Sequence, residues 1–172
     1  MRPLPVPDIP IGGVLGTAPD GDGWRLAVSV LGEANYGYEP RVKITVGPRK
    51  QHTVSADWWF IEDQEVQALL RWLRDAAAAA AACRGGEIGA LSGLQPSCEQ
   101  WLSVRVVPAP PTFPGGWAVQ VQFDDQMLRD DCRLNAVSLS ARSARALASL
   151  LKRALETAAR HPARIIRPEA PR

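Results

Sequence analysis

With 172 residues the chain has the length of one ordinary domain, and a chain of about 150 residues buries roughly two-thirds of its unfolded surface. Hydrophobic residues make up 46% and charged residues 22%, which is typical of a globular protein, and no stretch approaches the ~18 apolar residues that span a bilayer. The sequence therefore predicts no membrane insertion, and its net charge of +2 is too small to imply a polyanionic partner by itself.

Two features favour a cytoplasmic location. The first residues carry a positive charge but lack the apolar segment of a secretion signal, and they hold too many prolines for a signal helix. Cys83, Cys98 and Cys132 are irregularly spaced and form no CxxC pattern, so we interpret them as reduced thiols of a cytosolic protein. We expect neither a disulfide nor a zinc site.

Residues 1–23 are rich in proline and glycine and show no hydrophobic period, which predicts an extended arm. From residue 24 onward, two segments alternate apolar and polar residues as strands with one buried face do. Their apolar positions are Trp24, Leu26, Val28 and Val30, then Val42, Ile44 and Val46. A turn at residues 47–48 leads to a third short strand expected at residues 52–56.

A change of period then predicts a helix over residues 62–83, ended by Gly85 and Gly86. Its apolar positions are Val66, Leu69, Leu70, Leu73 and Ala77. Residues 24–84 therefore form a first unit of three strands and a helix, and residues 85–99 are interpreted as a linker.

The same order returns over residues 100–161, the second unit. Alternating segments begin near Leu102 and Trp117, a short third strand fits residues 134–139, and Ser140 is placed to cap the following helix. That helix carries an apolar stripe of Leu147, Leu150, Leu151, Ala154 and Leu155. Residues 162–172 are interpreted as a basic tail.

The sequence thus predicts an α+β protein of two tandem β-β-β-α units, a pseudo-duplication in which one amphipathic helix covers each antiparallel sheet. Leu70 and Leu151 are expected to be buried at corresponding helix positions. At the level of topology this order resembles the duplicated sheet-plus-helix units of the Pur-alpha and Whirly single-stranded nucleic-acid binders. The resemblance covers residues 24–82 and 101–159, rests on alternating strands such as residues 41–49 and on the closing helix, and implies nucleic-acid binding by the sheets.

No catalytic motif is recognisable. The chain lacks GxGxxG, GxxxxGK[ST], HExxH and GxSxG, and neither His52 nor His161 has a nucleophile or carboxylate at a recognisable catalytic spacing. An acidic cluster at Asp124, Asp125, Asp130 and Asp131 lacks the ligand alternation and the glycine of an EF-hand, and we interpret it as a solvated turn that could act as a recognition loop. We therefore expect a non-enzymatic protein without a cofactor or metal.

Trp58, Trp59 and Phe60 are the first candidate binding residues. Adjacent strand residues point to opposite faces, so at least one indole would lie outside a single core unless the three form a corner that wraps both rings inside. Exposed tryptophans anchor interfaces and stack on bases. Together with the arm, whose prolines pre-extend it, this corner is predicted to form the main binding surface.

Two sets of basic residues are further candidates. Arg41, Lys43, Arg49 and Lys50 lie on or beside the first sheet, out of phase with its core, where cations could neutralise phosphates. Arg142, Arg145, Lys152 and Arg153 lie on the second helix, in a region where eight basic residues face two acidic residues from residue 142 onward. A solvated helix face is the alternative interpretation of the second set.

Our leading hypothesis is a non-enzymatic interaction protein that acts in a homo-oligomer or a larger protein assembly, as an assembly component, an adaptor or an inhibitor. The alternative is a single-stranded nucleic-acid-binding protein that uses basic and aromatic sheet faces.

Overall fold

The chain folds into ten strands and two helices within the residues described by the computed structural model. These residues are 3–19, 21–37, 39–49, 56–60, 62–92, 100–111, 113, 115–125 and 136–168. The strands are β1 (Ile9–Thr17), β2 (Gly23–Val30), β3 (Glu33–Asn35), β4 (Val42–Pro48), β5 (Ala56–Phe60), β6 (Gly86–Ser92), β7 (Gln100–Pro108), β8 (Trp117–Asp125), β9 (Ala136–Leu139) and β10 (Arg164–Ile166). The helices are α1 (Asp63–Ala81) and α2 (Ala141–Arg160), so the α+β class is confirmed.

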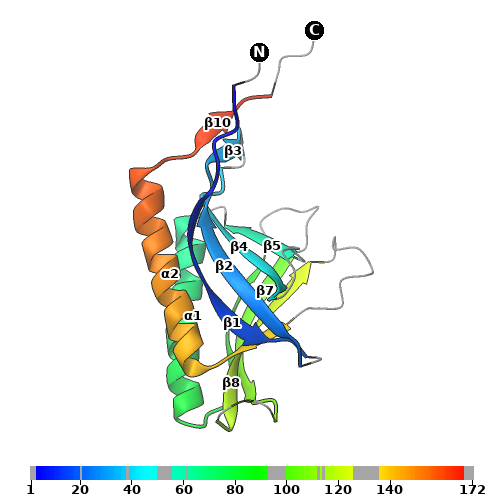
Figure 1. Cartoon of the computed structure of the whole chain (residues 1–172). Helices are drawn as coiled ribbons and strands as arrows, with labels where there is room; N and C mark the ends of the chain where they lie inside the picture. Colours follow the sequence, from blue (N-terminus) through cyan, green and yellow to red (C-terminus); the bar gives the residue numbers. More distant parts are fainter. Residues whose placement is uncertain are drawn as a thin grey trace.

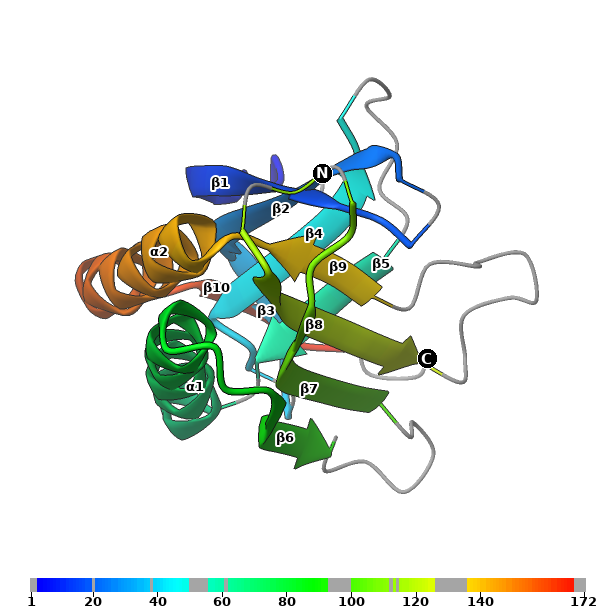
Figure 2. The ribbon, with the colours of Figure 1, turned by 90° about the horizontal axis from the view of Figure 1, so that it is seen from below.

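Eight strands form one antiparallel sheet in the order β5-β4-β2-β1-β9-β8-β7-β6 (Figure 2). The four strands before α1 and the four after it are each hydrogen-bonded in succession, and β1 and β9 join the two sets. The pair Thr17 and Ser138 is the registered contact between β1 and β9. The prediction of tandem β-β-β-α units is therefore wrong, because both sets of strands belong to one continuous sheet.

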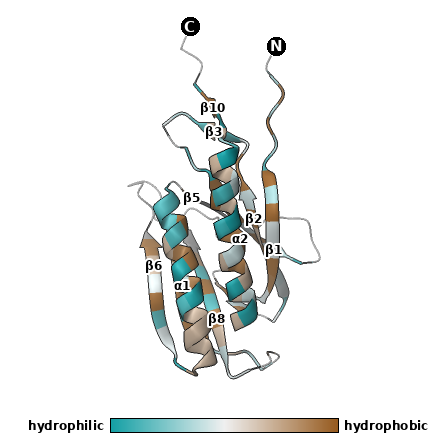
Figure 3. Ribbon diagram, turned by 90° about the vertical axis from the view of Figure 1, so that its left-hand side faces the viewer, coloured by the Kyte–Doolittle hydropathy of each residue, from teal (hydrophilic) through white to brown (hydrophobic). Residues whose placement is uncertain are grey.

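The two helices lie side by side on one face of the sheet and run in opposite directions (Figures 1 and 3). α1 follows the first set of strands but packs mainly on β6, β7 and β8, whereas α2 follows the second set but packs mainly on β1 and β2. The chain order accounts for this, because α1 connects β5 to β6, the two edge strands of the sheet, and β6 leads directly into β7 and β8. Each helix thus covers the strands of the other set, which corrects the expectation that each covers its own.

The core lies between the sheet and the helices, and the predicted alternation sets it up. Leu26, Val28 and Val30 of β2 and Val42, Ile44 and Val46 of β4 are all buried. Leu151 is fully buried, as predicted, and Ser140 caps α2 by accepting a hydrogen bond from the Ser143 N–H at 3.0 Å. Leu70 is only partly buried, which corrects the expectation for that residue and places it at the border of the buried face of α1, whereas Leu69 is fully buried.

β1 corrects the prediction that residues 1–23 form an arm without a folded element. It lies inside the sheet between β2 and β9, and a register shift between Pro10 and Gly12 accommodates the proline. A Cβ on Gly12 would lie 2.8 Å from Leu150 Cδ2, so the lack of a side chain at Gly12 lets α2 approach the strand closely. The residues that broke the hydrophobic pattern are therefore the ones that permit packing.

β6 likewise replaces part of the linker expected at residues 85–99. It pairs with β7 as the edge strand, and a Cβ on Gly89 would lie 2.2 Å from the Trp72 ring. Gly89 therefore leaves room for the indole of α1 against the sheet. A third strand was expected at residues 52–56: β5 spans Ala56–Phe60, and residues 52–55 lie outside the described part of the chain.

The expected basic tail contains a strand as well. β10 pairs in parallel with β3, with Arg164 opposite Glu33 and Ile166 opposite Asn35. This two-stranded sheet lies beyond one end of α2, and the chain's N-terminal segment passes beside it (Figure 1). Of the helices in the described part of the chain, none has both the length and the apolar character needed to cross a membrane.

Candidate protein-interaction site

Large exposed apolar side chains gather at one end of the molecule. Among the described residues six such side chains are exposed, and five of them belong to the N-terminal segment, the turn after β3, or β10. The five are Leu4, Val6, Tyr36, Ile165 and Ile166. We call this surface the tip and define it as residues 3–8, 33–36 and 164–167. The sixth side chain, Leu15 of β1, lies elsewhere.

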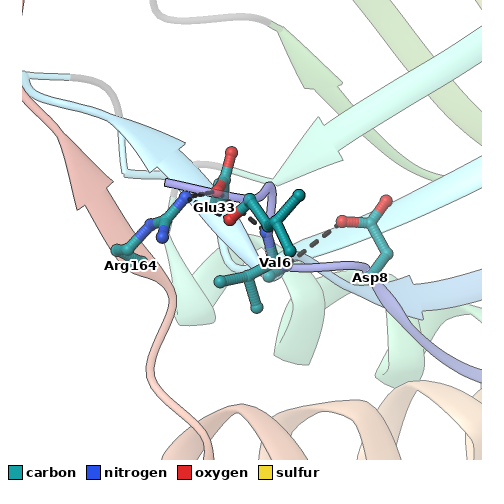
Figure 4. A network of polar contacts seen from close by, with 6 residues as sticks. Val6, Asp8, Glu33 and Arg164 are labelled. Atoms are coloured by element: carbon teal, nitrogen blue, oxygen red, sulfur yellow. Dashed lines mark hydrogen bonds and ion pairs between the residues drawn. The ribbon is translucent and has the colours of Figure 1, made fainter. Parts of the chain in front are cut away.

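Polar contacts hold the three segments of the tip together (Figure 4). The Glu33 carboxylate forms an ion pair with Arg164 and accepts a hydrogen bond from the Val6 N–H at 2.9 Å. The Arg164 guanidinium also donates to the Leu4 carbonyl oxygen at 3.1 Å. One ion pair therefore ties β3 to β10, and both of its members also hold the N-terminal segment.

Asp8 fixes the base of the N-terminal segment. Its carboxylate accepts hydrogen bonds from Lys43 Nζ at 2.8 Å and from the Gly32 N–H at 3.1 Å. Burial raises the pKa of Asp8. The hydrogen bonds from Lys43 and Gly32 and the charge of Lys43 together lower it by more than burial raises it, so the pKa of Asp8 lies below its ordinary value. A Cβ on Gly32 would lie 2.4 Å from the carbonyl oxygens of Val6 and Pro7, which shows how closely the segment rests on β3.

Two open grooves flank β10. One, of about 720 Å³, is lined by Pro3, Pro5, Glu33, Ile166, Arg167 and Pro168 among others. The other, of about 550 Å³, lies between β10 and the end of α2 and includes Ala34, Arg41, Ala159 and Pro162. Beside the first groove the Arg167 guanidinium stands 5.6 Å from the centre of the Tyr36 ring, a cation–π geometry. The tip thus combines apolar side chains, an aromatic ring and a cation.

The predicted aromatic corner is placed in β5, an edge strand of the large sheet. Register sets Trp58 opposite Ile44 and Trp59 opposite Lys43, while the side chains of both tryptophans lie outside what the structure describes. Phe60 is 1% exposed and belongs to the core, which agrees with the alternative of a corner that wraps its rings inside for this one ring. Its position opposite Val42 in the β4 register explains this burial.

The basic residues predicted beside the first sheet are placed in different settings. Arg41 pairs with Asp63 at 3.2 Å, and Lys43 pairs with Asp8 at 2.8 Å. Arg49 is exposed in the turn after β4, and Lys50 lies outside the described residues. The four cations predicted on the second helix, Arg142, Arg145, Lys152 and Arg153, are all exposed on α2.

Most of the tip has no signal in the local sequence. The N-terminal prolines were recognised as a stiff arm, but the partners of that arm, Glu33 and Arg164, stand 131 residues apart and share no local pattern. The adjacent pair Ile165 and Ile166 in an otherwise polar tail was the available signal, because such a pair is unusual in a solvated end.

Within the described ranges, no group of three or more His, Cys, Asp or Glu side chains could hold a metal ion. Of the acidic cluster at residues 124–131, the structure describes only the backbone of Asp124 and Asp125, at the end of β8. No protein-family model matches the chain, and no curated protein sequence matches it.

Proposed function

We propose that the protein is a non-enzymatic interaction protein that acts in a homo-oligomer or a larger protein assembly, and that the tip is its binding surface. The observation that carries the proposal is that, among the described residues, five of the six exposed large apolar side chains lie at one end of the molecule. Scattered exposed apolar residues need no explanation, whereas a cluster with a polar rim is typical of an interaction site.

The tip is also suited to binding because its segments are already ordered by the fold. Association normally costs about 0.5 to 1.5 kcal/mol for each rotamer-rich side chain that it immobilises, in addition to the cost of ordering loops. The contacts of Glu33, Arg164 and Asp8 have fixed the backbone of the N-terminal segment before any partner arrives. Tyrosine and arginine are enriched among the residues that dominate binding energy, so Tyr36 and Arg167 are the expected anchors.

Self-association is the first form of the proposal to test, by light scattering over a range of concentrations. The chain has a mass of 18.7 kDa, so a homo-oligomer should scatter as a multiple of that mass. Ile166→Asp places a charge on the tip and should weaken association by about 2 kcal/mol, which is roughly 30-fold in the dissociation constant.

Leu15→Asp is the matched control, because Leu15 is 46% exposed and Ile166 is 42% exposed, yet only Ile166 lies in the tip. Equal effects of the two substitutions would move the interface away from the tip. A monomer at every concentration would rule out self-association, and the tip would then have to bind a different protein.

The proposal places the protein in the cytoplasm. Cys83 is an exposed free thiol, and free thiols are normally kept reduced in that compartment. The alternative function, nucleic-acid binding by the sheet faces, loses support from the pairing of Arg41 with Asp63 and of Lys43 with Asp8. A phosphate would have to displace a carboxylate at each of these cations.

A further inference from the structure

The outward face of α2 carries a stripe of positive charge. Five cations on this helix are exposed: Arg142, Arg145, Lys152, Arg153 and Arg160. At 100° per residue they fall within about 100° of arc and extend over about 27 Å of the helix axis. Glu156 is the one carboxylate of α2 and lies within the same arc. Figure 3 shows this hydrophilic face turned away from the sheet.

The fold makes little use of these cations: among the described residues, their one side-chain contact is the hydrogen bond that Arg160 Nε donates to the Glu156 carbonyl oxygen at 3.4 Å. The ion pairs found in the described part of the chain involve Arg41, Lys43 and Arg164, and none involves a cation of α2. Helix stability accounts for Arg160 alone, because a cation in the last turn complements the helix dipole, whereas Arg142 lies in a first turn without an acidic residue and opposes it. The neighbouring helix is balanced, since its exposed charged residues are two cations and two carboxylates: Asp63, Arg71, Arg74 and Asp75.

The composition of the stripe indicates the kind of partner. A membrane-binding helix inserts an apolar face, but the apolar face of α2 is already packed in the core through Leu147 and Leu151. A protein-binding helix needs a large apolar anchor at its centre, whereas the exposed residues between Arg145 and Lys152 are Ala146 and Ser149. A phosphate backbone needs cations and close approach alone.

We propose that the α2 stripe binds the phosphate backbone of a nucleic acid without reading its sequence. The inference does not depend on the tip, which lies beyond the C-terminal end of α2 (Figure 1). Each cation would neutralise one phosphate and release a counterion, so affinity should fall steeply with salt. With five contacts on duplex DNA, raising salt from 50 to 200 mM should weaken binding by about 500-fold.

The experiment titrates the full chain against fluorescently labelled 20-mers, single- and double-stranded, over that range of salt. R145Q/K152Q/R153Q removes three cations of the stripe, leaves two contacts, and should reduce the salt effect on duplex binding to about 12-fold. R71Q/R74Q/R84Q is the matched control, because it removes three exposed cations outside the stripe and changes the net charge equally. The control should bind much as the unaltered chain does.

A second pair of variants tests the stripe by a gain of affinity, which no folding defect can imitate. Glu156→Gln should tighten binding several-fold, because it removes the carboxylate between the cations, whereas Asp75→Asn on α1 should have a smaller effect. Equal losses in the two triple variants would overturn the proposal, as would the absence of binding at 50 mM salt. Binding to vesicles of anionic phospholipid but to neither 20-mer would overturn it in favour of a membrane partner.

Discussion

The junction between the two sets of strands makes a demanding prediction about Gly16. This residue precedes Thr17, which pairs with Ser138 across the junction. A Cβ on Gly16 would lie 2.4 Å from Val137 Cγ1, 2.8 Å from Leu139 Cδ2 and 2.9 Å from the Ser138 carbonyl oxygen. Ordinary contacts begin near 3.4 Å, and a backbone oxygen cannot rotate away. Gly16→Ala should therefore push β1 and β9 apart.

The size of the effect follows from the cost of overpacking a closed site, which is about 1 to 3 kcal/mol. In a chain of this length 1 kcal/mol shifts the melting temperature by roughly 2 to 4 °C, so we expect Gly16→Ala to lower it by roughly 2 to 12 °C. Thermal unfolding followed by circular dichroism measures the shift. Gly23→Ala on the same hairpin is the control, because its Cβ would meet nothing closer than Arg49 Cβ at 3.8 Å.

Equal melting temperatures for Gly16→Ala and Gly23→Ala would refute this reasoning, because they would show that the junction accepts a methyl group without cost. A double-mutant cycle locates the strain. Val137→Ala removes the closest atom, so it should cost less in the Gly16→Ala background than in the unaltered chain.

Three further predictions concern the core and the tip. Leu151→Ala should lower the free energy of unfolding by about 2 to 5 kcal/mol, and Leu70→Ala should lower it clearly less because Leu70 is partly exposed. Chemical denaturation of the two variants compares these losses, and equal losses would contradict the assigned helix face. Because the folded pKa of Asp8 is lowered, the contribution of its carboxylate to stability is complete above the unfolded pKa of about 3.9 and is lost as the pH falls through the folded pKa. The difference in melting temperature between the unaltered chain and Asp8→Asn should therefore shrink to nothing in acid. A difference that stays constant with pH would exclude this linkage. Gly32→Ala should detach residues 3–8 from β3 while the core stays folded, which amide exchange of the Val6 N–H would report as lost protection.

Local pattern determined the secondary structure well where one face of an element is buried. Alternation over residues 24–30 and 42–46 corresponds to β2 and β4, and the change of period predicted a helix at residues 62–83 that the structure places at Asp63–Ala81. These elements are set by neighbouring residues, because side-chain direction repeats every 2 or 3.6 residues. The burial of Leu151 and the Ser140 cap followed from the same local rules.

The arrangement of those elements was decided by contacts between distant residues. The pattern of β1 and β6 is interrupted by Gly12 and Gly89, so local sequence did not predict these strands. Each glycine makes room for a side chain of a helix: Leu150 at Gly12 and Trp72 at Gly89. The exchange of the two helices between sets of strands follows from the single sheet, which local pattern does not encode.

The candidate site shows the same division. The sequence alone predicted a stiff N-terminal segment and a row of cations on the second helix, and it contains the pair Ile165 and Ile166 without indicating its role. Only the tertiary structure brings Leu4 to Arg164, 160 residues away, and so joins the exposed apolar side chains into the tip. It also decides which cations form ion pairs, because Lys43 meets Asp8 across 35 residues while the cations of α2 are exposed. Pairing depends on distances between elements, and those distances exist only once the chain has folded.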